Sequence, residues 1–398
     1  MAITTGTAEI ISIPAASSER TDGIRLCHFT TAHRQLKSRS FHRECLPLAA
    51  AGMAVHYAAP MDIRGRRDGV DFVALPEHAS RARRFLAGPS LVRELLRQDA
   101  SIYHFQDPEL LPVAFALKLI FGKRVVYDAY EDFPSVAASK AAIPRVLRPL
   151  AAAIVGASEK LAARCFDGVM TADPLTLRRL GRSGKSRKLV FYNFPNLDFF
   201  PAPKPHAKRF DVVYRGGLSE RTGTFVLLDA MRLLAARSKP ARLLLLGYFD
   251  DDAAEKRIRA RIRESELASS VEIRGRVDHE EMAEALSEAR AGVSPLQPHP
   301  KFLKNIPVKI FEYWACGLPV VASDLPPIRP FFRNVCGGFL FRPGCAAELA
   351  ARIGWLMEHP EYAARVGCAG RAAVVERFNN ESEVRKLREF CACIAASS

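Results

Sequence analysis

Apolar and polar residues follow two rhythms along this chain. Short runs rich in β-branched and other apolar residues alternate with longer stretches in which apolar residues recur every three or four positions. The short runs predict strands at 24–29, 53–59, 70–75, 101–105 and 124–128, and the stretches between them, including 39–51 and 91–98, predict helices. Strands that are apolar on both faces are typical of buried parallel sheets. Their alternation with helices indicates βαβ units.

This pattern stops between residues 194 and 210 and then starts again. Pro195, Pro201, Pro203 and Pro205 make residues 195–207 a stiff, non-helical connector. After it, further strands are predicted at 210–217, 241–247, 271–275, 291–296 and 318–323, and the chain ends in a helix at 381–395. The sequence therefore predicts an α/β protein with two Rossmann-like, doubly wound domains. In such sheets, ligands bind beyond the carboxyl ends of the strands.

The domain boundaries follow from the same interruption. We expect an amino-terminal domain over residues 1–200 and a carboxyl-terminal domain over residues 201–375. Residues 376–398 form a terminal helix that we expect to pack back toward the amino-terminal domain. A chain of 398 residues suits two domains of ordinary size.

Composition narrows the class of protein. Apolar residues make up 48% and charged residues 25%, the balance of a soluble globular protein. The longest apolar stretches, 110–121 and 149–157, are shorter than the roughly 20 residues of a membrane-spanning helix. The first residues lack the basic start and apolar run of a secretion signal. The nine cysteines include no CxxC pair, so we expect reduced thiols in a cytoplasmic protein and no metal site.

The net charge of +15 indicates anionic partners. Phosphorylated substrates or an anionic membrane surface come first, because no nucleic-acid-binding motif accompanies the charge. The basic amphipathic stretches 80–98 and 140–166 could lie peripherally on the inner face of the cytoplasmic membrane. Alternatively, both stretches pack on the sheet and expose their Arg and Lys side chains to water.

A glycine-containing loop is predicted between a strand and a helix at residues 214–223, YRGGLSERTG. Gly216 and Gly217 would let the backbone approach a ligand closely, and the N–H groups at the start of the following helix would favour a phosphate. Arg215 and Arg221 add positive charge nearby. The loop does not match GxGxxG, so no nicotinamide-type site is indicated, and an ordinary tight turn is an equal alternative.

A second candidate segment runs from residue 298 to 324. A loop with Lys301, Lys304 and Lys309 leads into a short helix that carries Glu312 before Gly317 ends it. Lys309 and Glu312 are about one helical turn apart and can share a face. A cation at that face suits a diphosphate, and a carboxylate can accept hydrogen bonds from ribose hydroxyls. An ordinary Lys–Glu surface pair is the alternative.

The run FEYWACGLPVVASD at 311–324 resembles the donor-site signature of family 4 glycosyltransferases, which have the GT-B fold. The resemblance extends over about residues 24–390 through LCHFTTAHRQLKSRSFHREC, YHFQDPELLPVAFALKLIFGKRVVYDAYEDFP, YNFPN and the loop at 216–223. It implies two Rossmann-like domains facing a central cleft and sugar transfer with retention of configuration. It also implies a nucleoside-diphosphate-sugar donor, no metal or other cofactor, and a glycan or lipid-linked acceptor in surface-polysaccharide or glycoconjugate biosynthesis.

The same resemblance assigns roles by position. Glu312 would bind the donor ribose, and Arg221 and Lys309, with the Gly216 and Gly217 amides, would stabilise the leaving diphosphate. The other donor-side positions are Gly247, Arg274, Gly275, Lys304, Asn305 and Ile306. The acceptor-side positions are His104, Asp107, Asp128 and Glu131, with Tyr130 counted among the catalytic residues.

Three residues depart from the family's pattern. Many members have a second Glu where Lys304 stands, and relatives usually have His where this chain has Gln106 and Tyr130. These departures favour one alternative to a glycosyltransferase, a non-catalytic GT-B relative that serves as a binding subunit. A second alternative is a sugar-nucleotide epimerase of the GT-B fold, which would share the donor pocket.

Overall fold

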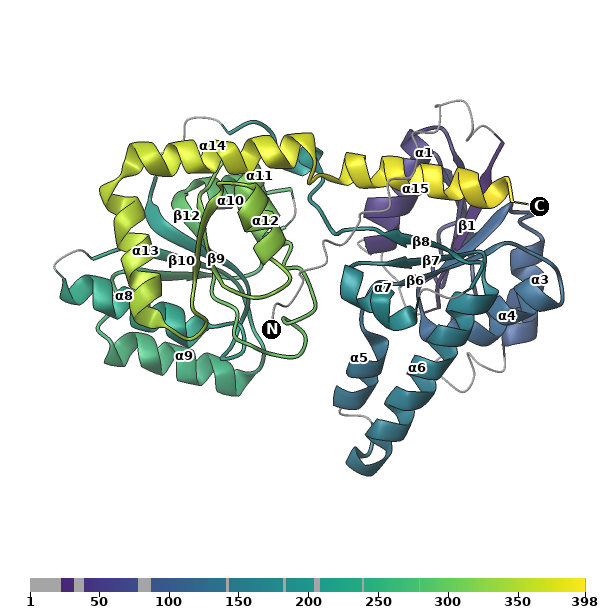
Figure 1. Ribbon diagram of the computed structural model, residues 1–398, viewed down its shortest axis with the longest axis horizontal. Helices are drawn as coiled ribbons and strands as arrows, with labels where there is room; N and C mark the ends of the chain where they lie inside the picture. Colours follow the sequence, from purple (N-terminus) through teal and green to yellow (C-terminus); the bar gives the residue numbers. More distant parts are fainter. Residues whose placement is uncertain are drawn as a thin grey trace, which may run out of the picture. The chain divides into compact units, whose positions relative to one another are not determined.

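The computed structural model describes residues 23–31, 39–77, 87–140, 143–181, 184–203, 208–237, 240–278 and 280–397. The chain divides into two compact units (Figure 1). Unit 1 comprises residues 1–192 and 383–398, and unit 2 comprises residues 193–382. The chain thus crosses between the units twice, after Tyr192 and after Ser382.

Unit 1 is built on an eight-stranded sheet in the order β3-β4-β2-β1-β5-β6-β7-β8. The pairing is parallel throughout, except that β3 runs antiparallel to β4. The strands are β1 (Arg25–Phe29), β2 (Ala54–Ala59), β3 (Gly65–Arg67), β4 (Val70–Ala74), β5 (Ile102–Phe105), β6 (Val125–Ala129), β7 (Gly168–Thr171) and β8 (Arg187–Val190). The strand order reverses between β1 and β5, and in doubly wound sheets such a switch point is where ligands bind.

Helices cover both faces of this sheet, and each face has its own apolar cluster. One cluster joins Phe29, Phe105 and Tyr127 of the strands to α3, α4 and α6. The other joins Tyr57 and Val126 to α1 and to the last helix of the chain, α15. The helices are α1 (Leu46–Ala50), α3 (Gly88–Leu96), α4 (Leu111–Leu119), α5 (Phe133–Ser139), α6 (Arg148–Cys165), α7 (Pro174–Leu180) and α15 (Asn380–Ala395).

The last helix contributes to unit 1 through close contacts on the sheet. A Cβ atom added at Gly168 of β7 would lie 2.6 Å from Ile394 and 2.7 Å from Phe390. The glycine at this position therefore leaves room for the ends of the Ile394 and Phe390 side chains. Residues 383–398 thus form part of the amino-terminal half of the protein, although they end the sequence.

Unit 2 contains a six-stranded, all-parallel sheet in the order β11-β10-β9-β12-β13-β14. This is the Rossmann order, with its switch point between β9 and β12. The strands are β9 (Phe210–Leu218), β10 (Leu243–Phe249), β11 (Val271–Arg274), β12 (Ala289–Ser294), β13 (Val320–Ser323) and β14 (Gly338–Phe341).

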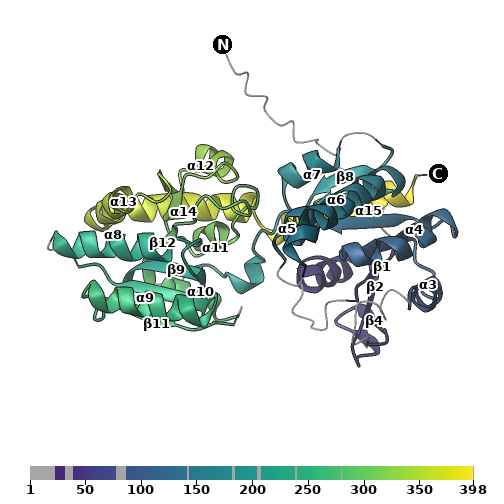
Figure 2. The same cartoon turned by 90° about the horizontal axis from the view of Figure 1, so that it is seen from below.

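The helices of unit 2 also form two layers (Figure 2). One layer packs Leu227 of α8, Ile258 of α9 and Ile353 of α13 onto the sheet. In the other, α11 packs on β12 and β13 and is covered by α14. The helices are α8 (Thr224–Ala236), α9 (Asp252–Glu264), α10 (Met282–Ser287), α11 (Lys309–Ala315), α12 (Arg329–Asn334), α13 (Ala346–Glu358) and α14 (Pro360–Glu376).

All ten strands expected from the sequence are present, with ends shifted by one or two residues. The predicted α/β class with two doubly wound sheets is confirmed. The sequence did not predict β3, β7, β8 and β14, and residues 40–45 begin the expected helix at 39–51 as a π-helical turn. None of the described helices combines the length and apolar character that a membrane-spanning segment needs.

Candidate functional site

Two glycines lie near the carboxyl ends of β9 and β10 in unit 2. Gly216 and Gly247 are paired across the two strands and have φ angles of 137° and 158°. A Cβ atom at Gly247 would lie 1.8 Å from the Gly216 carbonyl oxygen, and one at Gly216 would lie 2.9 Å from the Lys309 Nζ atom. Both positions therefore require glycine. Because Gly216 has no side chain, the Lys309 ammonium can lie close to its backbone.

The loop from β9 to α8 places Arg221 beside an acidic side chain. Hydroxyl groups hold this turn, because the Ser219 backbone N–H donates to Thr222 Oγ1 at 3.0 Å. Gly223, at φ 80°, precedes the first residue of α8. Arg221 forms an ion pair with Asp250, with 2.9 Å between Nη2 and Oδ2. The sequence had not singled out Asp250, which neutralises part of the positive charge predicted for a phosphate.

Lys309 begins α11, and its ammonium group lies against an aromatic ring. Its Nζ donates to the Tyr214 hydroxyl at 3.1 Å and lies 4.2 Å from the centre of that ring. Burial of the ammonium and the neighbouring Arg215 guanidinium lower the pKa of Lys309 from 10.5 to about 7, against the opposing effect of Glu312. A lysine amine whose pKa lies near neutrality can take up a proton, and so become charged, when an anion binds beside it.

Glu312 lies one turn further along α11 and is buried, with 1% exposure. Its Oε2 atom is 2.8 Å from Arg215 Nη1. The backbone N–H of Arg215 in turn donates to the Tyr313 hydroxyl at 2.8 Å. The side chains of α11 thus fix the end of β9, and a buried carboxylate is held in one orientation by a cation.

The remaining donor-side candidates lie around the same sheet edge. Arg274 is engaged by two carboxylates, with Nη1 2.6 Å from Glu288 and Nη2 2.8 Å from Glu272. Gly275 is exposed and has no neighbour within 4 Å of an added Cβ. Lys304, Asn305 and Ile306 lie half-buried in the segment that leads into α11.

Unit 1 contains a second group of polar residues, at the switch point of its sheet. The Thr30 hydroxyl, just after β1, donates to Asp107 Oδ2 at 2.7 Å, and the Thr31 N–H reaches the same atom at 3.3 Å. His28 and His104 face each other across β1 and β5, with 3.1 Å between their Nδ1 atoms. Burial lowers the pKa of His104 to about 4, so this ring is neutral at neutral pH.

Asp128, at the end of β6, is the centre of a buried network. Arg39 bonds to it directly, and Gln106 Nε2 donates to Asp128 Oδ2 at 2.8 Å. Arg39 Nη1 also lies 2.9 Å from Glu44 Oε1. Burial raises the pKa of Glu44 to about 8, even though Arg39 acts in the opposite direction. Burial of Glu44 therefore favours its protonated form.

Tyr130 and Glu131 follow β6 and are half-buried. The Tyr130 ring packs edge-on against Phe133 and lies 5.8 Å from the Arg39 guanidinium carbon. Burial, with the nearby Glu131, raises the pKa of Tyr130 to about 12. Its hydroxyl is therefore protonated at neutral pH and can donate a hydrogen bond.

Among the described residues, one set of three side chains has the spacing of a metal site. Ligand atoms of His28, Glu44 and His104 lie within 4.8 Å of one another, and all three residues are buried. Arg39 contacts Glu44 through Oε1, and Glu44 Oε2 lies 3.7 Å from His104 Nδ1. The trio is thus joined through Arg39 to the polar network around Asp128.

The structure thus brings the predicted residues together in two groups, one in each unit. Gly216, Gly247, Lys309 and Glu312 gather in unit 2, and His104, Asp107 and Asp128 gather in unit 1. Sequence reasoning gave no role to Arg39, Glu44, Asp250 or Tyr214, and mentioned Arg215 only as a nearby charge. Arg39 and Glu44 lie inside the quoted motif RSFHREC, but nothing in its spacing indicates Asp128 as their partner.

Comparison with known proteins identifies the carboxyl-terminal part of the chain. Residues 209–359 match the family model described as glycosyl transferases group 1. The match covers most of the carboxyl-terminal unit, which is therefore similar to glycosyl transferases group 1. The glycine turn, Lys309 and Glu312 all lie within the matched residues. The resemblance to glycosyltransferases is confirmed, whereas membership of family 4 remains a prediction.

The amylovoran biosynthesis glycosyltransferase AmsK of Erwinia amylovora is 30% identical over 174 residues, which is 44% of this chain and 42% of AmsK. The aligned part spans less than half the length of the relatives that it matches. The similarity is therefore partial, and the roles of the whole protein are treated as proposals below.

Solved structures match almost the whole chain. Sucrose-phosphate synthase from Thermosynechococcus elongatus superposes with a TM-score of 0.69 at 21% identity, covering 92% of this chain and 97% of the synthase. Anabaena HepE, in complex with UDP-glucose, superposes with a TM-score of 0.68 at 15% identity, covering 92% and 98%. At these identities the likeness establishes the fold, and the predicted GT-B class is confirmed.

Proposed function

We propose that this protein is a glycosyltransferase that moves a sugar from a nucleoside-diphosphate sugar to an acceptor. The observation that carries the proposal is the arrangement at the start of α11. There Lys309 meets the Gly216 backbone, and the buried Glu312 is held by Arg215. The site thus combines a glycine turn with accessible backbone, a lysine whose pKa lies near neutrality, and a carboxylate held in one orientation. These are the groups that a diphosphate and a ribose require.

Charge stabilisation is the main task in this chemistry, because negative charge develops on the departing diphosphate. Lys309 and the amides at Gly216 and Gly217 would face that charge, and Glu312 would accept hydrogen bonds from the ribose hydroxyls. Arg221 can assist only by sharing its charge between the phosphate and Asp250. A contact of this kind typically contributes about 3 kcal/mol, or roughly a hundredfold in rate.

The acceptor would bind at the polar group of unit 1. His104 is neutral, and Asp107 is already engaged by Thr30, so neither residue stands out as a general base. We propose that the leaving diphosphate accepts the proton of the acceptor hydroxyl, with retention of configuration and without a metal ion. The Tyr130 hydroxyl, protonated at neutral pH, would donate a hydrogen bond to the transferred sugar.

The first test is a thermal-shift screen against nucleoside diphosphates and their sugars. A ligand present at a hundred times its Kd stabilises the folded protein by about 2.7 kcal/mol. For a unit of this size, that corresponds to a rise in Tm of about 5–10 °C. Transfer should then fall about a hundredfold in Lys309→Ala and Glu312→Ala. Near-normal transfer in both variants would refute the donor site.

The biological setting that we propose is the assembly of a surface polysaccharide or glycoconjugate. The similarity to AmsK supports this setting. We further propose that the acceptor is presented at a membrane surface, and α6 carries a surface suited to that. Leu147, Leu150, Ile154 and Leu161 recur at helical spacing and are 49–60% exposed, and we call this set the α6 stripe.

Basic residues flank the α6 stripe. Arg145 precedes it, and Lys160 and Arg164 accompany Leu161, all three exposed. An apolar stripe with basic neighbours suits the surface of an anionic membrane. The other predicted stretch, 80–98, lies partly outside the described residues, and only α3 represents it.

Flotation with vesicles that contain an anionic phospholipid tests this contact. The wild type should float with the vesicles at low salt, and Ile154→Glu should reduce the floating fraction. Val375→Glu is the matched control, because Val375 is 49% exposed but lies on α14. Equal flotation of Ile154→Glu and wild type would exclude the α6 stripe as the contact.

A further inference from the structure

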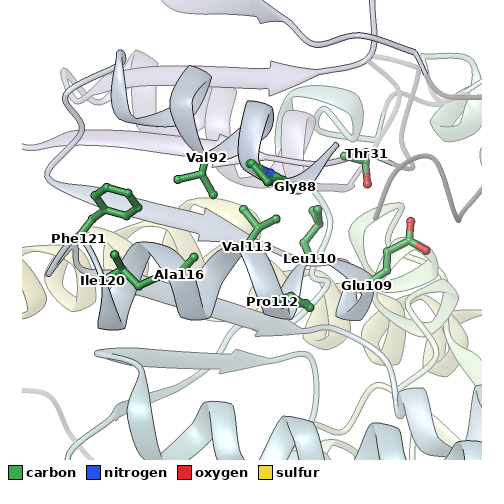
Figure 3. Close-up of a pocket in the computed structure, with 11 residues that line it drawn as sticks. Thr31, Gly88, Val92, Glu109, Leu110, Pro112, Val113, Ala116, Ile120 and Phe121 are labelled. Carbon is green, nitrogen blue, oxygen red and sulfur yellow. The ribbon is translucent and has the colours of Figure 1, made fainter. Parts of the chain in front are cut away.

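Unit 1 contains an apolar groove between α3 and α4, with a volume of about 640 Å³. Figure 3 shows Val92 of α3 on one side and Val113 and Ala116 of α4 on the other. The groove is lined by Thr31, Gly88, Pro89, Val92, Glu109, Leu110, Pro112, Val113, Ala116, Ile120 and Phe121. Only Thr31 and Glu109 among these carry polar side chains, and both lie at the same end (Figure 3).

The polar end of the groove is continuous with the candidate acceptor site. Thr31 lines the groove, and its backbone N–H donates to Asp107 Oδ2 at 3.3 Å. Asp107 precedes the short turn Pro108–Leu110, which carries the lining residues Glu109 and Leu110 into α4. A molecule in the groove would therefore have one end beside the polar residues at the switch point of the sheet.

The other end of the groove opens among exposed apolar side chains. Ile120 and Phe121, which line it, are 73% and 46% exposed, and the neighbouring Leu119 is 69% exposed. Basic residues accompany this surface, because the exposed Arg93 follows Val92 in α3 and the half-buried Lys123 follows Phe121 by two residues. Apolar side chains with basic neighbours are complementary to an anionic lipid surface.

We propose that this groove holds the hydrocarbon chain of a lipid-linked acceptor, whose polar head group lies toward Thr31 and Asp107. The proposal rests on the proposed transferase function and selects the lipid-linked class of acceptor. A continuous apolar channel with a polar mouth matches an amphiphile with a single chain better than it matches a free sugar, which would leave most of the groove unfilled.

The dimensions of the groove set the size of the expected effect. From Pro112 to Phe121, the wall formed by α4 and its end extends over nine residue steps, or about 14 Å at 1.5 Å per residue. Each methylene that enters the groove should tighten binding about fourfold, since burial of one methylene contributes about 0.8 kcal/mol. Affinity should thus depend on chain length and not only on the head group.

The test uses hexyl, octyl and decyl glucosides, each below its micelle-forming concentration, in calorimetric titrations of the full-length protein. Affinity should rise about fourfold with each added methylene. Ala116→Trp places an indole in the groove and should abolish this dependence, whereas Ala364→Trp, on the exposed surface of α14, should preserve it. Equal affinities along the series, or an unchanged dependence in Ala116→Trp, would overturn the proposal.

A second variant covers the case in which Ala116→Trp does not fold. Ile120→Glu places a charge at the exposed, open end of the groove and should weaken the binding of decyl glucoside more than the binding of hexyl glucoside. Nucleoside-diphosphate binding is measured on the same samples, because that site lies in unit 2. Absence of chain-length dependence in the wild type, with nucleotide binding intact, refutes the groove alone, and absent nucleotide binding in the wild type refutes the transferase proposal.

Discussion

Proton uptake by Lys309 is the most specific consequence of the proposed donor site. In the empty protein, burial and Arg215 lower the pKa of Lys309 to about 7. At pH 8 the ammonium has therefore lost its proton in about nine molecules of ten. A bound diphosphate would reverse this balance, because it places negative charge beside the amine. Replacement of Lys309 by Met removes the titrating group and keeps a long side chain against Tyr214.

The size of the effect follows from Coulomb's law. A unit negative charge about 4 Å from the ammonium, at an effective dielectric constant of about 20, stabilises the charged form by about 4 kcal/mol. This corresponds to a rise of about three pKa units and returns Lys309 close to its ordinary value. Binding at pH 8 should then take up about 0.9 proton per nucleoside diphosphate.

The assay is titration calorimetry at pH 8 in buffers with different ionisation enthalpies. The slope of the observed binding enthalpy against the buffer enthalpy gives the number of protons exchanged. The wild type should show uptake close to one proton, and Lys309→Met should show almost none and bind more weakly. The same slope in both proteins would refute the assignment of Lys309 to the diphosphate, and so would the absence of uptake in the wild type.

The remaining predictions concern stability and ligand binding. Folding lowers the pKa of Lys309, so the unfolded state binds more protons than the folded state between about pH 7 and 10.5. The contribution of Lys309 to the free energy of unfolding should therefore rise with pH in this range. Chemical denaturation should show that Lys309→Met lacks this contribution. Glu44 has the opposite sign: its folded pKa of about 8 exceeds the ordinary 4.5, so the free energy of unfolding of the wild type relative to that of Glu44→Gln should fall by up to about 1.4 kcal/mol per pH unit between these values. Gly247→Ala should lower the free energy of unfolding by about 2–4 kcal/mol, because the added methyl group overpacks against Gly216 and strains the backbone. Gly275→Ala should change the free energy of unfolding by less than about 0.5 kcal/mol, because Gly275 has open space around it.

The fold could be predicted from the sequence wherever a strand is apolar on both faces. Strands such as β5, with every residue buried, stand out as short apolar runs. β7, which the sequence did not predict, is also buried at every residue but is only four residues long, whereas the other missed strands are edge strands. β8 lies at the sheet edge and begins with Arg187 and Lys188, and β14 is an edge strand of four residues that begins with glycine. Edge strands are covered on fewer sides, so their sequences are constrained less strongly by burial.

The candidate site was predictable to the extent that a single segment carries it. Lys309 and Glu312 lie one turn apart on the same helix, and Gly216 lies in a recognisable strand-to-helix loop. Partners from distant segments were not predictable. The pairing of Arg39 with Asp128 joins residues 89 positions apart in the sequence. The Asp250 partner of Arg221 comes from the next strand-to-helix loop. Such pairs depend on the order of the strands, which local patterns do not specify.

A crystal structure of the protein with the nucleoside diphosphate that stabilises it most tests the central claim directly. We predict that the diphosphate lies against the backbone of Gly216 and Gly217 with the Lys309 ammonium beside it. The Glu312 carboxylate should accept hydrogen bonds from the ribose. A nucleotide bound elsewhere, with Glu312 still paired only to Arg215, would contradict the account.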